Sequence, residues 1–274
     1  MKSVTMQILA GLGVGVAVGL SGCAGGGAGS RPSSAPVPAR ELKRVASEGL
    51  LALAPSLTGG RHRAFKRYDR DGKATWADGG VRTIDLSGVA FDNDRTATLI
   101  APRHVLMSKH FGRKVGTRMV FHDRSGRPHE GFVVASRSGP NDIAVGQLNR
   151  PMPVRPYRVL SARADYGSLL RRVPVVLTNR KGYVFCHEVA AITPGGWASF
   201  GPGQVPGVAG KLVVGDSGNP GFLLINGEPI LIETHTLGGF GAGPFVSDPA
   251  NFAAINRLMG ELGSGERLSV LEVR

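Results

Sequence analysis

The sequence predicts an all-β protein, either a sandwich or a barrel, that ends in one helix. From Val81 onward, short apolar segments repeat with a period of two, which places alternate side chains on opposite faces of a strand. Turn residues such as Asp123-Arg124-Ser125-Gly126 separate these segments. A helical period is clear at the end, where Asp248–Leu262 follows a Ser-Asp-Pro start signal. These three observations favour β-sandwich or β-barrel architecture with a C-terminal helix.

The first 22 residues have the composition of a signal peptide. Lys2 precedes an uncharged run from Gln7 to Leu20, which is too short and too rich in glycine for a stable membrane-spanning helix. The sequence Leu20-Ser21-Gly22-Cys23 resembles the bacterial lipobox, whose cysteine becomes the lipidated first residue after cleavage. We therefore expect residues 1–22 to be removed and Cys23 to anchor the protein to a membrane. A secretory signal with an incidental cysteine is the alternative.

Two short segments connect this anchor to the globular part of the chain. Residues 23–40 are mostly Gly, Ser, Pro and Ala, the composition of a linker. Residues 41–57 space their leucines as in a short amphipathic helix, and residues 58–274 form the predicted domain. This order predicts a lipid-anchored protein of the cell envelope, at the outer membrane or on the periplasmic, extracytoplasmic face. Ala24, which is not aspartate, favours the outer membrane.

The predicted strands are short and follow one another with hardly a helix between them. Turn signals such as Ile225-Asn226-Gly227-Glu228 bound them. The predicted ranges are Val81–Leu86, Val89–Phe91, Thr96–Ile100, Arg118–His122, Gly131–Ser136, Ile143–Leu148, Val173–Leu177, Tyr183–Val189, Trp197–Phe200, Leu212–Val214, Gly221–Ile225 and Ile230–Thr234.

The chain is strongly basic, with a formal net charge of +13 that falls to +12 when the segment with Lys2 is removed. Such a surface attracts polyanions, and nucleic acid, anionic lipid headgroups and acidic polypeptides are all eligible partners. A local basic run comprises Arg61, Arg63, Lys66, Arg67 and Arg70. No aromatic ladder accompanies this run, so we interpret it as a solvated segment and expect no specific nucleic-acid partner.

Cysteine and histidine usage limits the chemistry further. If Cys23 carries lipid, Cys186 is the remaining thiol and no intrachain disulfide can form. Cys186 and His187 are neighbours on a predicted strand, so they point to opposite faces and do not form a catalytic pair. The histidine spacings do not fit a local helix-borne zinc pair, so we expect no metal and no cofactor.

Gly215-Asp216-Ser217-Gly218 has the composition that a serine nucleophile needs. A glycine has no Cβ to block the backbone, so the amides of Gly215 and Ser217 can both point at one developing oxyanion. In a chain with 41 glycines this tetrapeptide is weak evidence by itself. Its interpretation depends on a base and an acid elsewhere in the chain.

His104 and Asp142 are the candidate base and acid. His104 follows the apolar strand ending at Ile100, where the chain leaves a rigid scaffold. Asp142 stands directly before the strand Ile143–Leu148, an unusual place for a charge unless the charge has a use. An Asx-type turn cap is the alternative for Asp142. His110 is the alternative base, although the residues before it are typical of a loop.

Three segments together resemble the chymotrypsin-like serine proteases. They are Leu99-Ile100-Ala101-Pro102-Arg103-His104, then Asp142-Ile143-Ala144-Val145 with Pro151, then Gly215 to Pro220. The order His, Asp, Ser is that of this family and differs from the order in subtilisins and α/β-hydrolases. The resemblance runs from about Val81 to Leu262. Pro102-Arg103, Asn219 and the lack of disulfides depart from the family pattern.

The resemblance implies two six-stranded antiparallel β-barrels with a C-terminal α-helix, and a serine endopeptidase site between the barrels. His104 would move the proton of Ser217, Asp142 would hold the imidazole, and the Gly215 and Ser217 amides would bind the oxyanion. Asp216 would be buried against a cation. A tethered N-terminus cannot supply that cation, so we expect an internal Arg or Lys there.

The resemblance also implies where the substrate side chain binds. The corresponding positions are Lys211 and His235-Thr236-Leu237-Gly238, and the His-Thr pair resembles the glutamyl endopeptidase branch. Lys211, His235 and the basic surface favour an acidic residue before the cleaved bond. The alternative is that Lys211 faces solvent and His235 packs inside the barrel.

Two other classes of function remain open from the sequence. One is a catalytically silent binding lipoprotein with a protease fold, and the other is an envelope-polymer or nucleic-acid binder that uses the basic run. The preferred interpretation is a monomeric, membrane-anchored endopeptidase acting on protein or peptide substrates.

Overall fold

The computed structural model describes residues 35–57, 62–91, 95–203, 205 and 208–274. The predicted signal peptide, Cys23, most of the linker and Arg61 lie outside these ranges. None of the helices within them is long and apolar enough to cross a membrane. The described chain is mostly β-structure with a few helices, as the sequence predicts.

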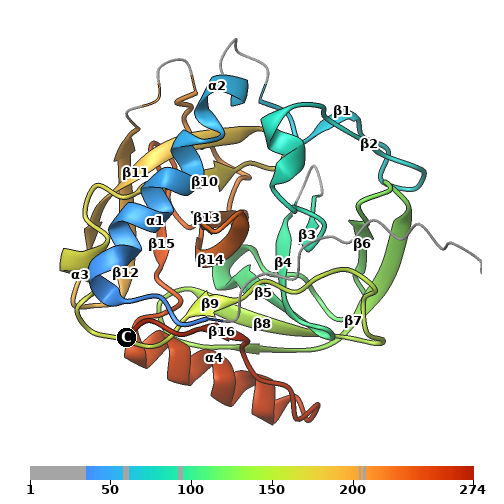
Figure 1. Ribbon diagram of the computed structural model, residues 1–274. Coiled ribbons are helices and arrows are strands. Elements are labelled where there is room, and N and C mark those ends of the chain that lie inside the picture. Colours follow the sequence, from blue (N-terminus) through green and yellow to red (C-terminus); the bar gives the residue numbers. More distant parts are fainter. Residues whose placement is uncertain (1–34, 58–61, 92–94, 204, 206–207) are drawn as a thin grey trace, which may run out of the picture. The chain divides into compact units, whose positions relative to one another are not determined.

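Within the described residues, six strands form a first sheet that curls into a nearly closed barrel (Figure 1). Its edge strands β3 and β6 contact each other. In sheet order the strands are β3 (Val89–Ala90), β4 (Ala97–Ala101), β5 (His104–Ser108), β8 (Ile143–Leu148), β7 (Pro128–Ser138) and β6 (Arg118–His122). Neighbouring strands pair antiparallel throughout.

In the same described part of the chain, eight strands form a second sheet that curls into a half-barrel. In sheet order they are β15 (Ala242–Pro244), β12 (Trp197–Pro202), β11 (Val184–Ile192), β10 (Pro174–Thr178), β13 (Pro220–Ile225), β14 (Glu228–Thr234), β9 (Val159–Leu160) and β16 (Val270–Leu271). The strand β9 pairs parallel with β14 and with β16. A further pair, β1 (Phe65–Arg67) and β2 (Thr75–Trp76), is separate from both sheets.

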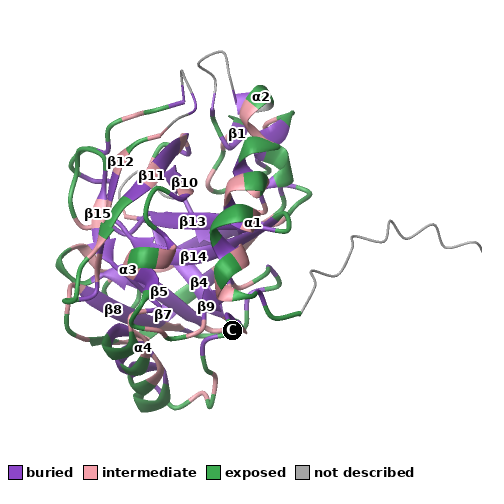
Figure 2. Ribbon diagram, turned by 60° about the vertical axis from the view of Figure 1, so that its left-hand side comes forward, coloured by how far each residue is buried: buried purple, intermediate pink, exposed green. Residues whose placement is uncertain are grey.

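Both faces of the central strands are buried, and successive side chains of a strand pack into two different apolar clusters. In β4 and β5, Leu99 and Val105 point into one apolar cluster, while Ile100 and Leu106 point into another. The second cluster also contains Phe222 of β13, so apolar side chains of the two sheets pack together. Figure 2 shows these central strands in the colour of buried residues. Burial of apolar surface on both faces is the main stabilising contribution to such a core.

Helices cover the outside of the sheets. The helix α1 (Ala39–Leu51) buries Leu42, Ala46 and Leu50, which recur every fourth residue on one face, and packs on β13 and β10. Gly49 permits this, because a Cβ there would collide with the carbonyl of Leu224. The shorter helices are α2 (Ala54–Leu57), α3 (Tyr166–Leu169), η1 (Gly80–Thr83) and η2 (Lys109–Phe111). The helices α1 and α2 occupy most of residues 41–57, where the sequence predicts one short amphipathic helix.

The C-terminal helix α4 (Pro249–Glu261) also lies where the sequence predicts it. Asp248 caps its first turn by accepting hydrogen bonds from the amides of Ala250 and Asn251, and Pro249 occupies the first position. Ile255, Leu258 and Met259 are buried and join the apolar cluster that links the two sheets. The helix contacts β7 and β8 of the first sheet.

The predicted strands differ from the structure in three places that matter for the site. Residues 81–86 begin in the 3-10 helix η1, and Leu212 makes only an isolated bridge to Gly239. The third difference is that β5 begins directly after the Pro102-Arg103 turn, where the sequence predicts the end of a strand followed by a loop. His104 is therefore the first residue of a core strand.

Candidate active site

Ser217 lies in a tight loop between Leu212 and β13. The loop is shaped by Gly215 and Gly218, whose φ angles are 95° and 85°, a region that favours glycine. A side chain at Gly218 would also place a Cβ 2.6 Å from the carbonyl oxygen of Thr96. The Gly218 amide donates a hydrogen bond of 2.9 Å to the carbonyl of His235. These contacts fix the backbone of the loop, and the side chain of Ser217 is half-exposed on it.

His110 is the histidine that the structure brings to Ser217. Its Nε2 lies 3.0 Å from Ser217 Oγ, and its Nδ1 lies 2.7 Å from Asp142 Oδ2. His110 is on η2, the single turn that follows β5, and its side chain is 48 % exposed. With the ring proton on Nδ1, the imidazole donates to the carboxylate and its Nε2 is free to accept the serine proton.

Asp142 is positioned by contacts from both sheets. Its Oδ1 accepts a hydrogen bond of 2.8 Å from the backbone amide of His110, and its Oδ2 accepts one of 2.8 Å from Thr236 Oγ1. Its own carbonyl accepts a bond of 2.7 Å from the Lys109 amide. Asp142 has a φ of 64°, so a strained backbone aims its carboxylate at His110 from the turn before β8.

His104 does not reach Ser217, which corrects the predicted catalytic histidine. Its side chain is 0 % exposed, and its Nδ1 donates to Glu266 Oε2 at 2.7 Å. The amide of Arg103 donates to the same oxygen at 3.2 Å, and Ser264 Oγ is 3.4 Å from the His104 Nδ1. His104 therefore ties the start of β5 to the segment after α4. Burial lowers the pKa of this imidazole, and Glu266 partly offsets that effect.

One signal in the sequence could have separated the two histidines. The apolar run Val105-Leu106-Met107 follows His104 directly, and such a run predicts a second core strand after the Pro102-Arg103 turn. On that interpretation the strand ends at Ser108, and His110 stands where the chain leaves the sheet. The structure has this arrangement, with Ser108 Oγ donating to the His235 carbonyl at 2.7 Å.

The amides of Gly215 and Ser217 form the candidate oxyanion hole. Neither amide has a hydrogen-bond partner among the residues that the structure describes, whereas the neighbouring amides of Asp216 and Gly218 bond to carbonyl groups. A donor without a protein partner next to a serine hydroxyl is available to a developing negative charge. Both predicted residues therefore place an available backbone donor beside the Ser217 hydroxyl.

Asp216 is buried and contacts an internal cation, as the sequence analysis expects. Its Oδ2 accepts from the Val213 amide at 2.8 Å, and its Oδ1 accepts from the Arg180 amide at 3.2 Å. The Arg180 Nε lies 4.0 Å from the same Oδ1. The Arg180 side chain also occupies the space that a side chain at Gly215 would need. Arg180 comes just after β10, and no motif in the sequence singles it out.

A cleft of about 520 Å³ opens beside Ser217. It is lined by His110, Phe111, residues 212–217 and residues 235–238. Val213, Val214 and Leu237 are exposed there, with Val214 95 % exposed. Gly238 and Thr236 line the cleft as predicted, but Lys211 is an exposed residue just outside the lining residues.

His235 and Thr236 are not free to receive a carboxylate, which corrects the predicted acidic pocket. The His235 side chain is 1 % exposed, and its Nε2 donates to the Thr178 carbonyl at 3.0 Å. Its Nδ1 lies 2.6 Å from Glu233 Oε1, a contact that does not meet hydrogen-bond geometry. Because His235 is buried and the Thr236 hydroxyl donates to Asp142, neither side chain offers a free donor to a carboxylate in the cleft.

The arrangement can transfer a proton and stabilise an oxyanion, and it combines a hydroxyl, an imidazole and a carboxylate in hydrogen-bond contact. Among the described residues no group of three His, Cys, Asp or Glu side chains is placed to hold a metal ion. A comparison of this chain with models of known protein families and with curated proteins finds no match.

Proposed function

We propose that this chain is a serine endopeptidase whose triad is His110, Asp142 and Ser217. The observation that carries the proposal is the continuous pair of contacts from Ser217 Oγ to His110 Nε2 and from His110 Nδ1 to Asp142 Oδ2. Two amides without protein partners beside the serine support it. The order of the three residues along the chain and the Gly-Asp-Ser-Gly sequence support a membership in the chymotrypsin-like family.

In the proposed reaction, Ser217 Oγ attacks the carbonyl carbon of the scissile peptide while His110 Nε2 accepts the hydroxyl proton. The carbonyl oxygen becomes an oxyanion that the Gly215 and Ser217 amides bind. His110 then donates its proton to the leaving amine, and the C–N bond breaks to leave an acyl-serine. Water attacks the ester with the same base and restores Ser217. Asp142 keeps the imidazole in the required tautomer and stabilises its cation.

The proposal includes the finer fold that the family implies, two six-stranded barrels. For the second sheet, isolated bridges support it, since Glu233 of β14 pairs with Phe245 and Leu237 pairs with Ala242 of β15. In sheet order β15 and β14 are the outer strands of the six-strand stretch β15-β12-β11-β10-β13-β14. These bridges bring the two outer strands together, as the closure of a barrel requires. The site then lies where residues of both sheets meet, with His110 and Asp142 from the first and Ser217 from the second.

We further propose that the cleft accepts an apolar side chain before the scissile bond. Exposed Val213, Val214 and Leu237 line the space beside Ser217, and contact with an apolar group would remove their surface from water. Lys211, the cation that the sequence predicts for the pocket, is exposed and is not among the described residues that line the cleft. Attachment to a membrane of the cell envelope through Cys23 also stays a proposal, because it rests on the lipobox resemblance alone.

Labelling with a fluorophosphonate probe tests the proposed chemistry. The wild-type protein should form a covalent adduct at Ser217, and Ser217→Ala and His110→Ala should abolish labelling. Ser199→Ala, at a half-exposed serine outside the site, is the matched control and should label normally. Failure of the folded wild-type protein to label would overturn the proposal in favour of a binding protein with a silent site.

A further inference from the structure

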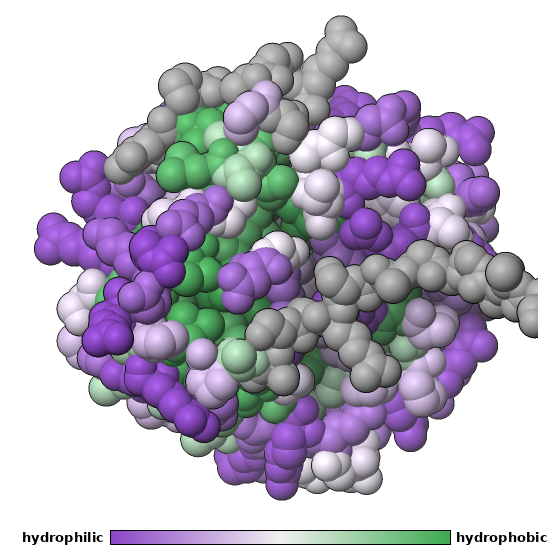
Figure 3. Space-filling view, viewed as in Figure 1, coloured by the Kyte–Doolittle hydropathy of each residue, from purple (hydrophilic) through white to green (hydrophobic). Residues whose placement is uncertain are grey.

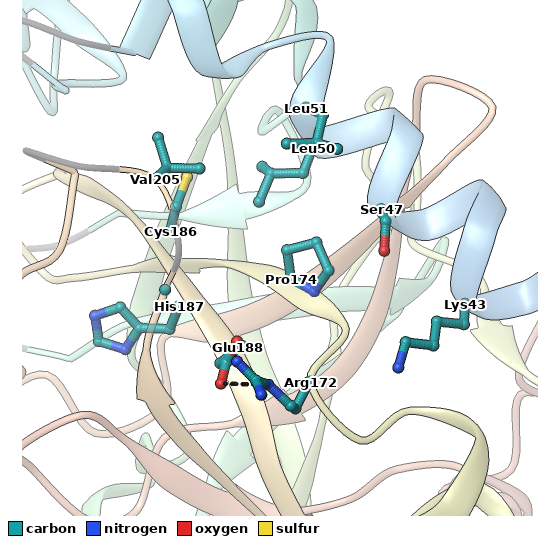
Figure 4. A pocket seen from close by; sticks show the side chains of 11 residues that line it. Lys43, Ser47, Leu50, Leu51, Arg172, Pro174, Cys186, His187, Glu188 and Val205 are labelled. Carbon is teal, nitrogen blue, oxygen red and sulfur yellow. Dashed lines mark ion pairs between the residues drawn. The ribbon is translucent and has the colours of Figure 1, made fainter.

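A second pocket, of about 400 Å³, lies between α1 and the strands β10 and β11 and shares no lining residue with the cleft beside Ser217. Its volume is within the range of about 300–1,000 Å³ that is typical of small-molecule sites. Figure 3 views the face that carries α1, where apolar residues gather between hydrophilic ones. Figure 4 shows that the pocket has two chemically different ends.

One end of the pocket is apolar. Leu50 and Leu51 from the end of α1 face Cys186 of β11 across it, with Pro174 nearer the middle (Figure 4). Burial raises the pKa of the Cys186 thiol to about 12, so this thiol is neutral at physiological pH. Leu51 is 59 % exposed, which leaves a large apolar side chain at the rim without cover. An apolar ligand group would remove this surface from water.

The other end of the pocket is charged. Arg172 and Glu188 form an ion pair there with 3.5 Å between Arg172 Nε and Glu188 Oε1. Lys43 extends from the first half of α1 toward the same end (Figure 4) and is exposed, and its ammonium group makes no hydrogen bond or ion pair to any described residue. Among the described lining residues the charges of Arg172 and Glu188 cancel, so Lys43 leaves this end with one net positive charge.

Two details indicate that the charged end is built rather than incidental. Arg172 has a φ of 60°, a left-handed conformation that is uncommon for a long side chain and that recurs at ligand sites. Its amide donates to the Val189 carbonyl at 2.8 Å, which holds the strained residue in place. His187 also lines the pocket, but its Nδ1 donates to the Phe240 carbonyl at 2.7 Å and is not available to a ligand.

We propose that this pocket binds a free amphiphile with one alkyl chain and one anionic head, such as a medium-chain carboxylate. The chain would lie against Leu50, Leu51 and Cys186, and the head would contact Lys43. A ligand of this kind satisfies both ends at once, whereas a purely polar anion leaves Leu51 exposed and a purely apolar molecule leaves Lys43 without a partner. A single head charge matches the single net positive charge of the pocket.

Isothermal titration with decanoate, below its micelle concentration, tests the proposal on the whole domain. Decanoate should bind at one site, and decyltrimethylammonium, with the same chain and a cationic head, should not. Lys43→Gln should weaken binding about threefold to fivefold, the usual scale of an exposed charge contact. Leu51→Ser should weaken it about tenfold by removing apolar contact. Both positions are exposed, and unchanged melting temperatures should show that both variants fold.

Lys114→Gln is the matched control, because Lys114 is also exposed and lies outside the pocket. It should bind decanoate like the wild type. Equal affinity in Lys43→Gln, Leu51→Ser and the control would mean non-specific adsorption and would overturn the proposal, as would the absence of any binding. Sedimentation with phosphatidylglycerol vesicles distinguishes a membrane-docking surface: loss of vesicle binding in Leu51→Ser, without decanoate binding, would also overturn it.

Discussion

Thr236 Oγ1 donates a hydrogen bond of 2.8 Å to Asp142 Oδ2, the oxygen that also accepts from His110 Nδ1 at 2.7 Å. Thr236 follows β14 of the second sheet, whereas Asp142 and His110 belong to the first. The contact therefore fixes the carboxylate of one sheet relative to the serine loop of the other. It also means that the hydroxyl proton of Thr236, which lines the cleft, is already donated within the protein.

Replacing Thr236 by valine should lower kcat/KM about tenfold, because one hydrogen bond to a charged acceptor is lost while the side-chain shape is kept. Thr236→Ser should retain most of the activity. The measurement is the hydrolysis of a chromogenic peptide across a pH series. A valine variant with wild-type kcat and an unchanged pH profile would show that Thr236 does not support Asp142.

Replacing Arg180 by methionine should reduce both activity and stability. Asp216 would stay buried without its cation, and the loop that carries Gly215 would lose the guanidinium packed against it. Since Arg180 is partly exposed and 4.0 Å from the carboxylate, we expect a loss of about 1 kcal/mol in the free energy of unfolding. Urea denaturation measures this loss, with Arg171→Met as an exposed control. Equal effects of the two substitutions would exclude a special role for Arg180.

A panel of peptides that differ only in the residue before the cleaved bond should favour leucine, valine or phenylalanine over glutamate and arginine. The reason is that Val213, Val214 and Leu237 offer apolar surface, while His235 and Thr236 are engaged inside the protein. Leu237→Asp should lower kcat/KM for the apolar peptides. Preferred cleavage after glutamate would contradict this prediction and would indicate that Lys211 binds the substrate carboxylate.

His104 should make the protein less stable in mild acid. Burial lowers its pKa below the ordinary 6.5, so the unfolded chain binds a proton that the folded chain does not. His104 therefore contributes stability that is present above about pH 6.5 and is lost as the pH falls toward the lowered pKa. Glu266, which raises this pKa, and Arg103, which lowers it, are the charged groups that act on the ring.

His104→Gln keeps a donor for Glu266 but does not titrate. The difference in unfolding free energy between wild type and this variant should shrink from pH 7.5 to pH 5.5, as urea denaturation at each pH would show. Comparing the two proteins cancels the other groups that titrate in this window, such as buried His122 and His187, whose pKa values are also lowered by burial. If this free-energy difference grew as the pH fell, folding would raise the pKa of His104 and not lower it, which would contradict the prediction.

Cys186 should resist alkylation in the native protein. Its thiol is buried, and burial raises its pKa to about 12, so hardly any thiolate is present at pH 8. Intact-mass measurement after iodoacetamide treatment should show no adduct at Cys186 in native buffer and full modification in urea. Rapid native alkylation would mean that the β11 region opens readily.

The sequence determined much of the secondary structure, because alternation and capping are local properties. The strands Arg118–His122 and Ile143–Leu148 match the prediction to the residue, and Asp248 and Pro249 start α4 as expected. It also singled out Ser217, Asp142 and the glycine at 215 as candidates, since a serine flanked by glycines and a charge directly before an apolar strand are visible along the chain.

Tertiary structure decided which histidine meets the serine. His104 is the first residue of β5 and His110 lies on η2 directly after it, and the pairing of β5 with β8 places His104 in the core and His110 beside Asp142. Tertiary structure also determines that Arg180 contacts Asp216 and that Thr236 contacts Asp142. These partners come from distant parts of the chain. Arg180 reaches Asp216 because β10 and β13 pair within the second sheet, whereas Thr236 reaches Asp142 because the two sheets pack together.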